Sequence, residues 1–144
     1  MIPNFRAWDK ANKKMCDVKA WSEFNGGEVT IKRDGENASY VVPLDDIVLM
    51  QSTGLFDNSE PPKEIFEGDI VETIYNGKLF TGVVVYDQEE TDFKATDGRN
   101  EYGNNFYYLG GNDSNIVIGN VHQHPDLLES VEVEWWKLND GRWI

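Results

Sequence analysis

The sequence predicts a mainly β protein, in which an N-terminal β-rich lobe is followed by a small SH3-like β-barrel, a short helix and a C-terminal strand extension. Two observations favour this class. Short segments in which apolar and polar residues alternate recur along the chain, as is typical of half-buried strands. Turn signals rich in Gly, Asn and Asp separate these segments, and five short strands within about sixty residues indicate a small, strongly bent barrel.

The N-terminal lobe is expected over residues 1–60. Its first two strands form a hairpin around a polar turn, and Gly26-Gly27 ends the second of them. Residues 44–50 fit a single helical turn that leads into a strand. Trp8 and Trp21 lie in alternating strands and are expected to belong to the core. The four expected strands are residues 5–8, 15–24, 28–32 and 40–42.

The barrel is expected over residues 61–124, after a connection at residues 54–63 that collects Gly, Asp, Asn, Ser and two prolines. Residues 69–75 alternate cleanly, and Asn76-Gly77 is a strong signal for a type I′ hairpin turn. The remaining strands are expected at residues 79–86, 93–95, 102–109 and 116–118.

The last part, residues 125–144, is expected to hold a short helix and a Trp-rich strand. Pro125 stands at the first position of the helix, and acidic residues fill its first turn, as the helix dipole prefers. In the strand, neighbouring residues face opposite ways, so Trp136 faces outward unless another surface covers it. Tryptophan is a typical interface anchor, and a tail that folds back onto its own barrel is the alternative. The candidate interface residues are Val131, Val133, Trp135, Trp136 and Trp143.

The chain of 144 residues is acidic, with 13 Lys and Arg against 26 Asp and Glu and a formal net charge of −13. This balance argues against direct nucleic-acid binding, which needs a basic surface, and against docking on anionic lipid. Residues 1–20 differ, because five basic and two acidic side chains give them a net charge of +3. Such asymmetry can mark two surfaces of opposite sign and head-to-tail self-association, although a solvated basic turn is the commoner explanation.

The single cysteine, Cys16, excludes an intramolecular disulfide and a Cys-based zinc site within one chain. The N-terminus has no apolar run of signal-peptide length, and no stretch approaches the ~20 apolar residues of a membrane span. We therefore expect a cytoplasmic protein that does not contact a membrane.

Three carboxylates surround a glycine at the start of a predicted strand, namely Glu64, Glu67 and Asp69 around Gly68. Paired carboxylates could share a proton or hold a metal ion. Glycine in such a turn allows a sharp entry of the backbone, and acidic turns are mostly structural. We expect Glu67, Gly68 and Asp69 to set the geometry of the barrel rather than to perform chemistry.

Two further patterns resemble metal sites. Residues 87–98 carry acids at the first, third and sixth places of a calcium-type loop, but Asp92 and Gly98 replace the required glycine and bidentate glutamate. His122 and His124 would project to one side of a strand, but they lack a third ligand, and His124 could instead lie near the start of the helix. We expect neither a metal site nor a cofactor.

The sequence carries no pattern typical of catalysis. It has no G-x-S-x-G, no Cys–His signature and no Walker loop. Gly110-Gly111 precedes no helical sequence, so it indicates a hairpin turn rather than a phosphate-binding loop. We therefore expect no enzymatic activity.

Four blocks, in the same order, resemble the YopX-like family of small phage and prophage proteins. They are FRAWDKANKKM at 5–15, LMQSTGLFD at 49–57, KEIFEGDIVE at 63–72 and IGNVHQHPDLL at 118–128. The resemblance implies a phage or prophage origin and a largely β fold with an N-terminal lobe and an SH3-like barrel, and it supplies no catalytic residues. Two departures are local: DNSEPP lengthens the link before the third block, and EVEWWKLNDGRWI looks like an individual extension.

Two functional hypotheses follow. The first is a non-enzymatic phage accessory protein that forms a homo-oligomer and acts as a scaffold, presenting a surface to another phage or host protein. The second is an acidic DNA mimic that occupies a host nucleic-acid-binding protein, for which charge density is the only support. A hydrolase or metal enzyme built from the acidic loops lacks a motif.

Overall fold

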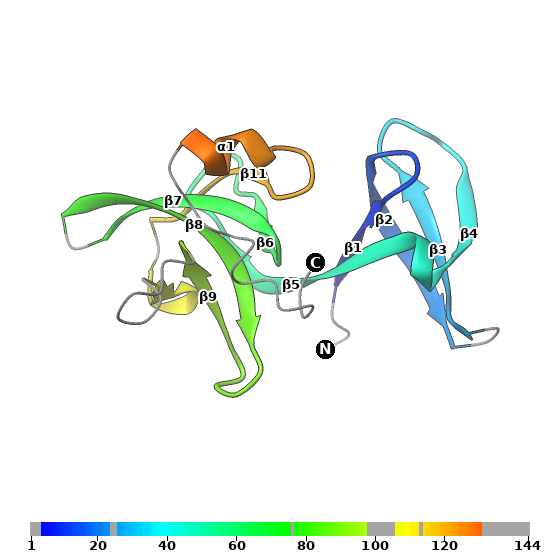
Figure 1. Cartoon of the computed structure of the whole chain (residues 1–144), viewed down its shortest axis with the longest axis horizontal. Coiled ribbons are helices and arrows are strands. Elements are labelled where there is room, and N and C mark those ends of the chain that lie inside the picture. Colours follow the sequence, from blue (N-terminus) through cyan, green and yellow to red (C-terminus); the bar gives the residue numbers. More distant parts are fainter. Residues whose placement is uncertain (1–3, 24–25, 76, 98–105, 113, 131–144) are drawn as a thin grey trace. The chain divides into compact units, whose positions relative to one another are not determined.

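The computed structural model of the protein describes residues 4–23, 26–75, 77–97, 106–112 and 114–130 (Figure 1). These residues form two antiparallel sheets and a short α-helix, which confirms the predicted mainly β class. The chain divides into two compact units, Met1–Ser52 and Thr53–Ile144. The sequence placed the boundary of the N-terminal lobe later, after residue 60.

The first unit is built on strands that follow one another as antiparallel neighbours. Its elements are β1 (Phe5–Asp9), β2 (Lys14–Ser22), β3 (Glu28–Arg33), β4 (Ser39–Pro43), the 3₁₀ turn η2 (Leu44–Asp46) and β5 (Ile47–Phe56). The sheet order is β4-β3-β2-β1-β5-β6, so β5 pairs with β1 and, beyond the end of the first unit, with β6. Residues 44–50 are therefore a single turn that leads into a strand, as their apolar spacing indicates.

The core of the first unit forms because alternate residues of its strands face one side of the sheet. Ala7 lies opposite Cys16 across β1 and β2, and both are buried with side chains from β3 and β5. Trp21, which the sequence assigned to the core, is instead 50% exposed. The register between β2 and β3 shifts between Val18 and Ala20, so the period-two alternation is interrupted just before Trp21.

The second unit carries a five-stranded sheet and a short helix. Its elements are β6 (Glu64–Phe66), β7 (Asp69–Tyr75), β8 (Lys78–Asp87), β9 (Asp92–Thr96), β10 (Phe106–Tyr108), the 3₁₀ turn η3 (Leu109–Gly111), β11 (Ile116–Asn120) and α1 (Pro125–Ser130). The hairpin of β7 and β8 is confirmed, with Tyr75 opposite Lys78 and Gly77 at a φ of 76°. The first part of the strand expected at 102–109 lies outside the described residues, and Leu109 begins η3.

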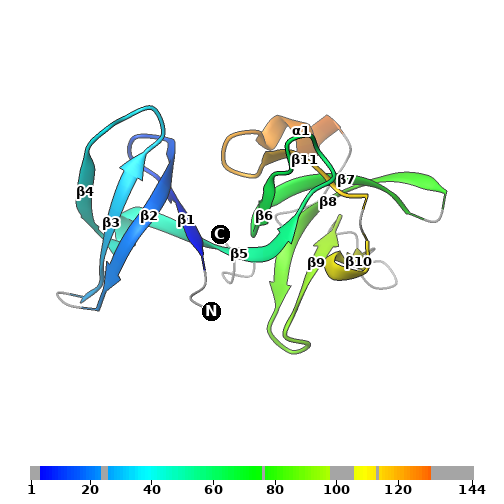
Figure 2. The same cartoon turned by 180° about the vertical axis from the view of Figure 1, so that it is seen from behind.

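The strand order in the second unit is β10-β9-β8-β7-β11, so the last strand lies beside the first. The pairings of the described strands leave β10 and β11 as the two ends of this order and do not close the sheet into a barrel. Both views show α1 beside β11 (Figures 1 and 2).

Both faces of the five-stranded sheet are buried where β7 and β8 pair. Val71 and Val84 belong to one apolar cluster, which also includes Ile65 of β6. Their neighbours Ile70 and Val83 belong to a second cluster, in which Leu128 of α1 is fully buried. Because successive residues of a strand face opposite sides, this stretch reads as a continuous apolar run rather than an alternating one.

Asp57 fixes the long connection between β5 and β6. Its Oδ1 accepts the backbone N–H groups of Ser59 and Lys63 at 3.1 and 2.8 Å. Its Oδ2 accepts the Ser59 hydroxyl at 2.7 Å and the N–H of Val117 in β11 at 2.9 Å. Burial of the side chain alone would raise the pKa of Asp57, but these hydrogen bonds outweigh burial and lower it.

Candidate protein-interaction surface

Lys94 of β9 is almost fully buried although its side chain carries a charge. Its Nζ lies 2.9 Å from Asp87 Oδ2 and 2.9 Å from Glu90 Oε1. The register places Lys94 opposite Val85, so Asp87, two residues further along β8, is its diagonal neighbour on the same face. The two carboxylates compensate the charge that burial would otherwise penalise.

Two aromatic rings of β10 complete the surroundings of this ammonium group. Its Nζ lies 4.2 Å from the ring centre of Phe106 and 5.3 Å from that of Tyr108. The Tyr108 hydroxyl donates a hydrogen bond of 2.6 Å to Glu90 Oε2. A cation over aromatic faces is stabilised by the ring quadrupole. We call these five side chains the Lys94 cluster: Asp87, Glu90, Lys94, Phe106 and Tyr108.

The charges of the Lys94 cluster support one another. The hydrogen bond from Lys94 is the main cause that lowers the pKa of Asp87. The pKa of Glu90 is lowered first by the hydrogen bond from Tyr108 and then by that from Lys94. Burial alone would lower the pKa of Lys94, but the bonds to both carboxylates raise it. All three groups are therefore ionised around neutral pH.

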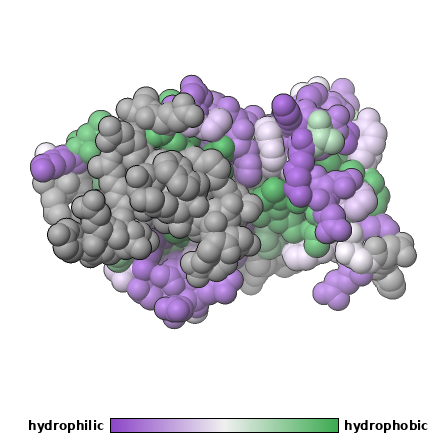
Figure 3. All heavy atoms as spheres, viewed as in Figure 1, coloured by the Kyte–Doolittle hydropathy of each residue, from purple (hydrophilic) through white to green (hydrophobic). Residues whose placement is uncertain are grey.

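The loop beside the Lys94 cluster exposes further carboxylate side chains to solvent. Asp87 Oδ1 accepts the N–H groups of Glu89 and Glu90 at 2.9 and 3.1 Å, and these bonds hold the turn between β8 and β9. Glu89 and Asp92 are exposed, and 44% of Tyr108 is exposed. Hydrophilic side chains gather at this end of the β8–β9 hairpin (Figure 3). Residues 87–94 therefore carry four carboxylates against one ammonium group.

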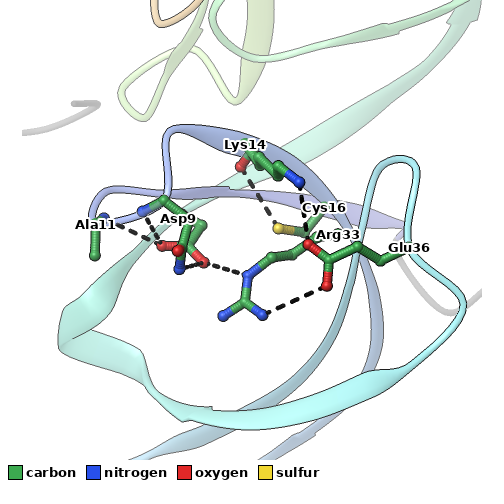
Figure 4. Close-up of polar contacts among 7 residues, drawn as sticks. Asp9, Ala11, Lys14, Cys16, Arg33 and Glu36 are labelled. Atoms are coloured by element: carbon green, nitrogen blue, oxygen red, sulfur yellow. Dashed lines mark hydrogen bonds and ion pairs between the residues drawn. The ribbon is translucent and has the colours of Figure 1, made fainter.

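A basic turn lies in the other unit, between β1 and β2. Asp9 Oδ1 accepts the N–H groups of Ala11 and Asn12, both at 3.1 Å, and Oδ2 accepts the Arg33 Nε–H at 2.7 Å (Figure 4). These bonds fix a turn in which Lys13 has a φ of 54°. We call residues 10–14 the basic turn, because they carry three exposed lysines and no acid: Lys10, Lys13 and Lys14.

Next to this turn, the carboxyl group of Asp9 is held deprotonated and the thiol of Cys16 is held protonated. Burial alone would raise the pKa of Asp9, but the hydrogen bonds from Arg33 and Asn12 outweigh it and lower the pKa to about 2. Burial, assisted by the charge of Asp9, raises the pKa of Cys16 to about 11. Cys16 is 1% exposed, and its Sγ lies 3.5 Å from the carbonyl oxygen of Lys14. A buried, protonated thiol is a poor nucleophile.

Glu67, Gly68 and Asp69 form the turn between β6 and β7. Gly68 has a φ of 83°, a conformation that glycine adopts without strain. Its N–H donates to the carbonyl oxygen of Val84, and its own carbonyl accepts the N–H of Val121, both at 2.9 Å. Asp69 Oδ2 accepts the N–H of Phe66 at 2.8 Å. The turn thus joins β6 and β7 to β8 and to the segment after β11.

His122 and His124 do not lie on a strand, and His124 directly precedes α1, as the alternative interpretation of the sequence expected. β11 ends at Asn120, and both histidines follow it in the connection to α1. Asn120 holds this connection, because its Oδ1 accepts the N–H groups of His122 and Gln123 at 3.1 and 2.9 Å. The Nδ1 of His124 accepts the N–H of Asn120 at 3.2 Å, so one of its two nitrogens is already bonded.

Among the residues that the structure describes, no three His, Cys, Asp or Glu side chains are grouped so that they could hold a metal ion. In the same part of the chain, no helix is both long and apolar enough to span a membrane.

The predicted Trp-rich interface cannot be placed, since Val131, Val133, Trp135, Trp136 and Trp143 lie outside the described residues. Other large apolar side chains are exposed. Ile74 and Leu79 lie directly opposite each other in the β7–β8 hairpin and are 60% and 65% exposed. They form a cross-strand apolar pair on one face of the hairpin.

The sequence did not reveal the Lys94 cluster. The resemblance of residues 87–98 to a calcium loop assigns no role to Lys94, which lies within that segment. The acids were visible, but the pairing of β9 with β10 that brings Phe106 and Tyr108 to Lys94 was not. Two features of the sequence could have indicated the cluster: a lysine within an acid-rich hairpin, and two aromatic residues in the next strand.

The described residues form antiparallel sheets in two compact units, with charged side chains fixed on the turns. These features define a class of small β proteins, but they do not indicate a reaction. A family model described as YopX protein matches residues 4–129, and the chain belongs to the YopX family. The crystal structure of protein EF1440 from Enterococcus faecalis is similar, with a TM-score of 0.51 and 26% identity, covering 89% of this chain and 99% of that chain. No curated protein matches the chain.

Proposed function

We propose that the protein is a non-enzymatic scaffold that self-associates and presents a surface to another phage or host protein. The cross-strand pair of Ile74 and Leu79 carries this proposal. Single exposed apolar residues are common on monomers, but a paired apolar patch at the end of a hairpin costs free energy in water unless a partner covers it. We propose a second copy of the chain as that partner.

The proposal is tested by sedimentation velocity over a range of protein concentrations. Replacing both Ile74 and Leu79 by serine is expected to weaken self-association about tenfold, since each truncation removes apolar area from the interface. Val41→Ser is the matched control, because Val41 is 61% exposed but lies on β4 of the first unit. A wild-type chain that stays monomeric at all concentrations contradicts the proposal.

The predicted interface in the tail is tested separately. Deleting residues 131–144 is expected to change the oligomer and to expose apolar surface if the tail holds copies together. An unchanged mass and an unchanged solubility would exclude the tail from the interface.

The second unit is proposed to be an SH3-like barrel. Its strand order supports this, because the last strand lies beside the first and a 3₁₀ turn precedes the last strand. We further propose a phage or prophage origin and a cytoplasmic location. The four sequence blocks support the origin, and the single buried cysteine fits a reducing compartment.

A DNA mimic is the alternative function, and the distribution of charge favours it. The second unit carries eighteen acidic and six basic side chains, a net charge of −12, whereas the first carries eight and seven, a net of −1. The test passes host lysate over the tagged protein at ~0.1 M and ~0.5 M salt, where the Debye length falls from roughly 10 to about 4 Å. A captured DNA-binding protein that double-stranded DNA displaces, and that the higher salt removes, supports mimicry.

A further inference from the structure

The basic turn and the acidic loop carry charges of opposite sign and lie in different units of the chain. The basic turn, residues 10–14, carries three exposed lysines. Lys14 is ion-paired with Glu36 at 3.1 Å and the Lys10 Nζ donates to the carbonyl oxygen of Asp45 at 2.8 Å, so Lys13 is the lysine on which the docking depends most. The acidic loop beside the Lys94 cluster exposes Glu89 and Asp92, and the half-exposed Tyr108 is bonded to Glu90 of the same loop. One turn belongs to the first unit and the other to the second.

We propose that the basic turn of one copy docks on the acidic face of the Lys94 cluster of a second copy, so that copies associate head to tail. This inference rests on the proposed self-association and adds to it the residues that orient the copies. The apolar pair of Ile74 and Leu79 supplies affinity in that scheme. The charges supply specificity and orientation, which is the usual division between the two at protein interfaces.

The chemistry of the two surfaces fits a lysine-rich partner. Lys94 already bonds Asp87 and Glu90, so the ammonium groups of an incoming turn would meet the exposed carboxylates of Glu89 and Asp92. The exposed part of the Tyr108 ring offers a surface for the aliphatic stem or the ammonium group of Lys13. A partner that carried acids at this position would be repelled.

Both surfaces are held in place before they meet. The side chain of Asp9 fixes the basic turn through its bonds to Ala11, Asn12 and Arg33 (Figure 4). The side chain of Asp87 fixes the acidic loop, and Lys94 ties that loop to β9. Preformed surfaces lose less conformational entropy on binding than mobile ones.

A head-to-tail contact has a consequence for assembly. The two surfaces differ, so a single contact leaves one basic turn and one acidic loop free, and further copies can add until a ring closes. Self-association is therefore expected to pass beyond the dimer and to weaken as salt rises, because exposed charges are screened.

Charge reversal tests the proposal. Lys13→Glu and Glu89→Lys, measured separately by sedimentation velocity at ~0.05 M salt, are each expected to weaken self-association roughly fivefold or more, since a favourable contact becomes repulsive. Mixing the two variants restores association, because the wild-type basic turn of the second meets the wild-type acidic loop of the first. Lys19→Glu and Glu60→Lys are matched controls, because both residues are exposed and lie outside the two turns.

The outcomes separate this proposal from the one on which it rests. A wild-type chain that remains monomeric overturns the self-association itself. A wild-type chain that associates while Lys13→Glu and Glu89→Lys behave like their controls overturns only the head-to-tail contact. Variants that weaken association singly but do not restore it when mixed also overturn the contact, since their effects then come from elsewhere.

Discussion

Arg33 on β3 donates its Nε–H to Asp9 on β1, across the intervening strand β2, at a distance of 2.7 Å. The guanidinium carbon also lies 4.6 Å from the centre of the Tyr40 ring on β4. Arg33 thus contacts one side chain on β1 and one on β4, the two strands that flank the β2–β3 pair. Asp9 is 3% exposed, so its carboxylate depends on this partner and on the turn that it caps.

Stability is expected to fall in acid as Asp9 takes up a proton. Its pKa drops from 3.8 in the unfolded chain to about 2 on folding, so the unfolded state binds the proton more readily. The contribution, on the order of 2 kcal/mol, is complete above the unfolded pKa and is lost as pH falls from about 4 towards 2. Urea unfolding across this range measures it. Asp9→Asn should flatten the dependence, and an unchanged slope would contradict the assignment.

Replacing Lys94 by methionine is expected to destabilise the second unit. The change keeps the apolar stem but leaves the carboxylates of Asp87 and Glu90 without their shared cation. Lys78→Met, at an exposed position on β8, is the matched control. The midpoint of thermal unfolding should drop by a few degrees for Lys94→Met and stay near the wild-type value for the control. Equal midpoints would show that the cluster contributes nothing.

Gly68→Ala is expected to cost more than the same change at Gly35. Both glycines have a φ of 83°, so both substitutions incur strain of roughly 1–2 kcal/mol. Gly68 is buried and bonds Val84 and Val121 through its backbone, whereas Gly35 lies in an exposed turn with open space at its Cβ position. The difference between the two free energies of unfolding, from urea titration, reports the structural role of the Glu67–Asp69 turn.

Cys16 is expected to resist thiol reagents while the protein is folded. Its thiol is 1% exposed, and its pKa of about 11 keeps it protonated at pH 8. A colorimetric disulfide reagent should modify it slowly in buffer and quickly in denaturing urea. Rapid modification under native conditions would show that the first unit opens readily.

The sequence predicted those parts of the fold that local chemistry determines. The β7–β8 hairpin followed from the Asn-Gly pair between residues 69–75 and the β-branched and aromatic run at 79–86, and the helix at Pro125 followed from its first turn. β6 was missed because the acidic residues around Gly68 favoured a turn at the entrance to the next strand. Trp21 was misplaced because the register shift before it leaves no mark in the sequence.

The contacts around Lys94 and Asp9 could not be predicted because they join different strands. Lys94 meets acids seven and four residues before it, which proximity alone suggests, but its aromatic contacts require the pairing of β9 with β10. Arg33 and Asp9 are separated in the sheet by β2, and their contact depends on the pairing of β1, β2 and β3, which cannot be derived from the sequence.

Asp57 gives the connection between β5 and β6 a defined length. The segment after it has the composition of an exposed loop, in which proteolytic cleavage and insertions are usually tolerated. Here, however, the Asp57 carboxylate accepts the backbone N–H groups of Ser59, Lys63 and, on β11, Val117. A cut or an added residue between positions 59 and 63 would break this set of bonds. A change in the length of this link is therefore expected to be tolerated only where the Asp57 carboxylate still reaches the backbone at both ends of the link.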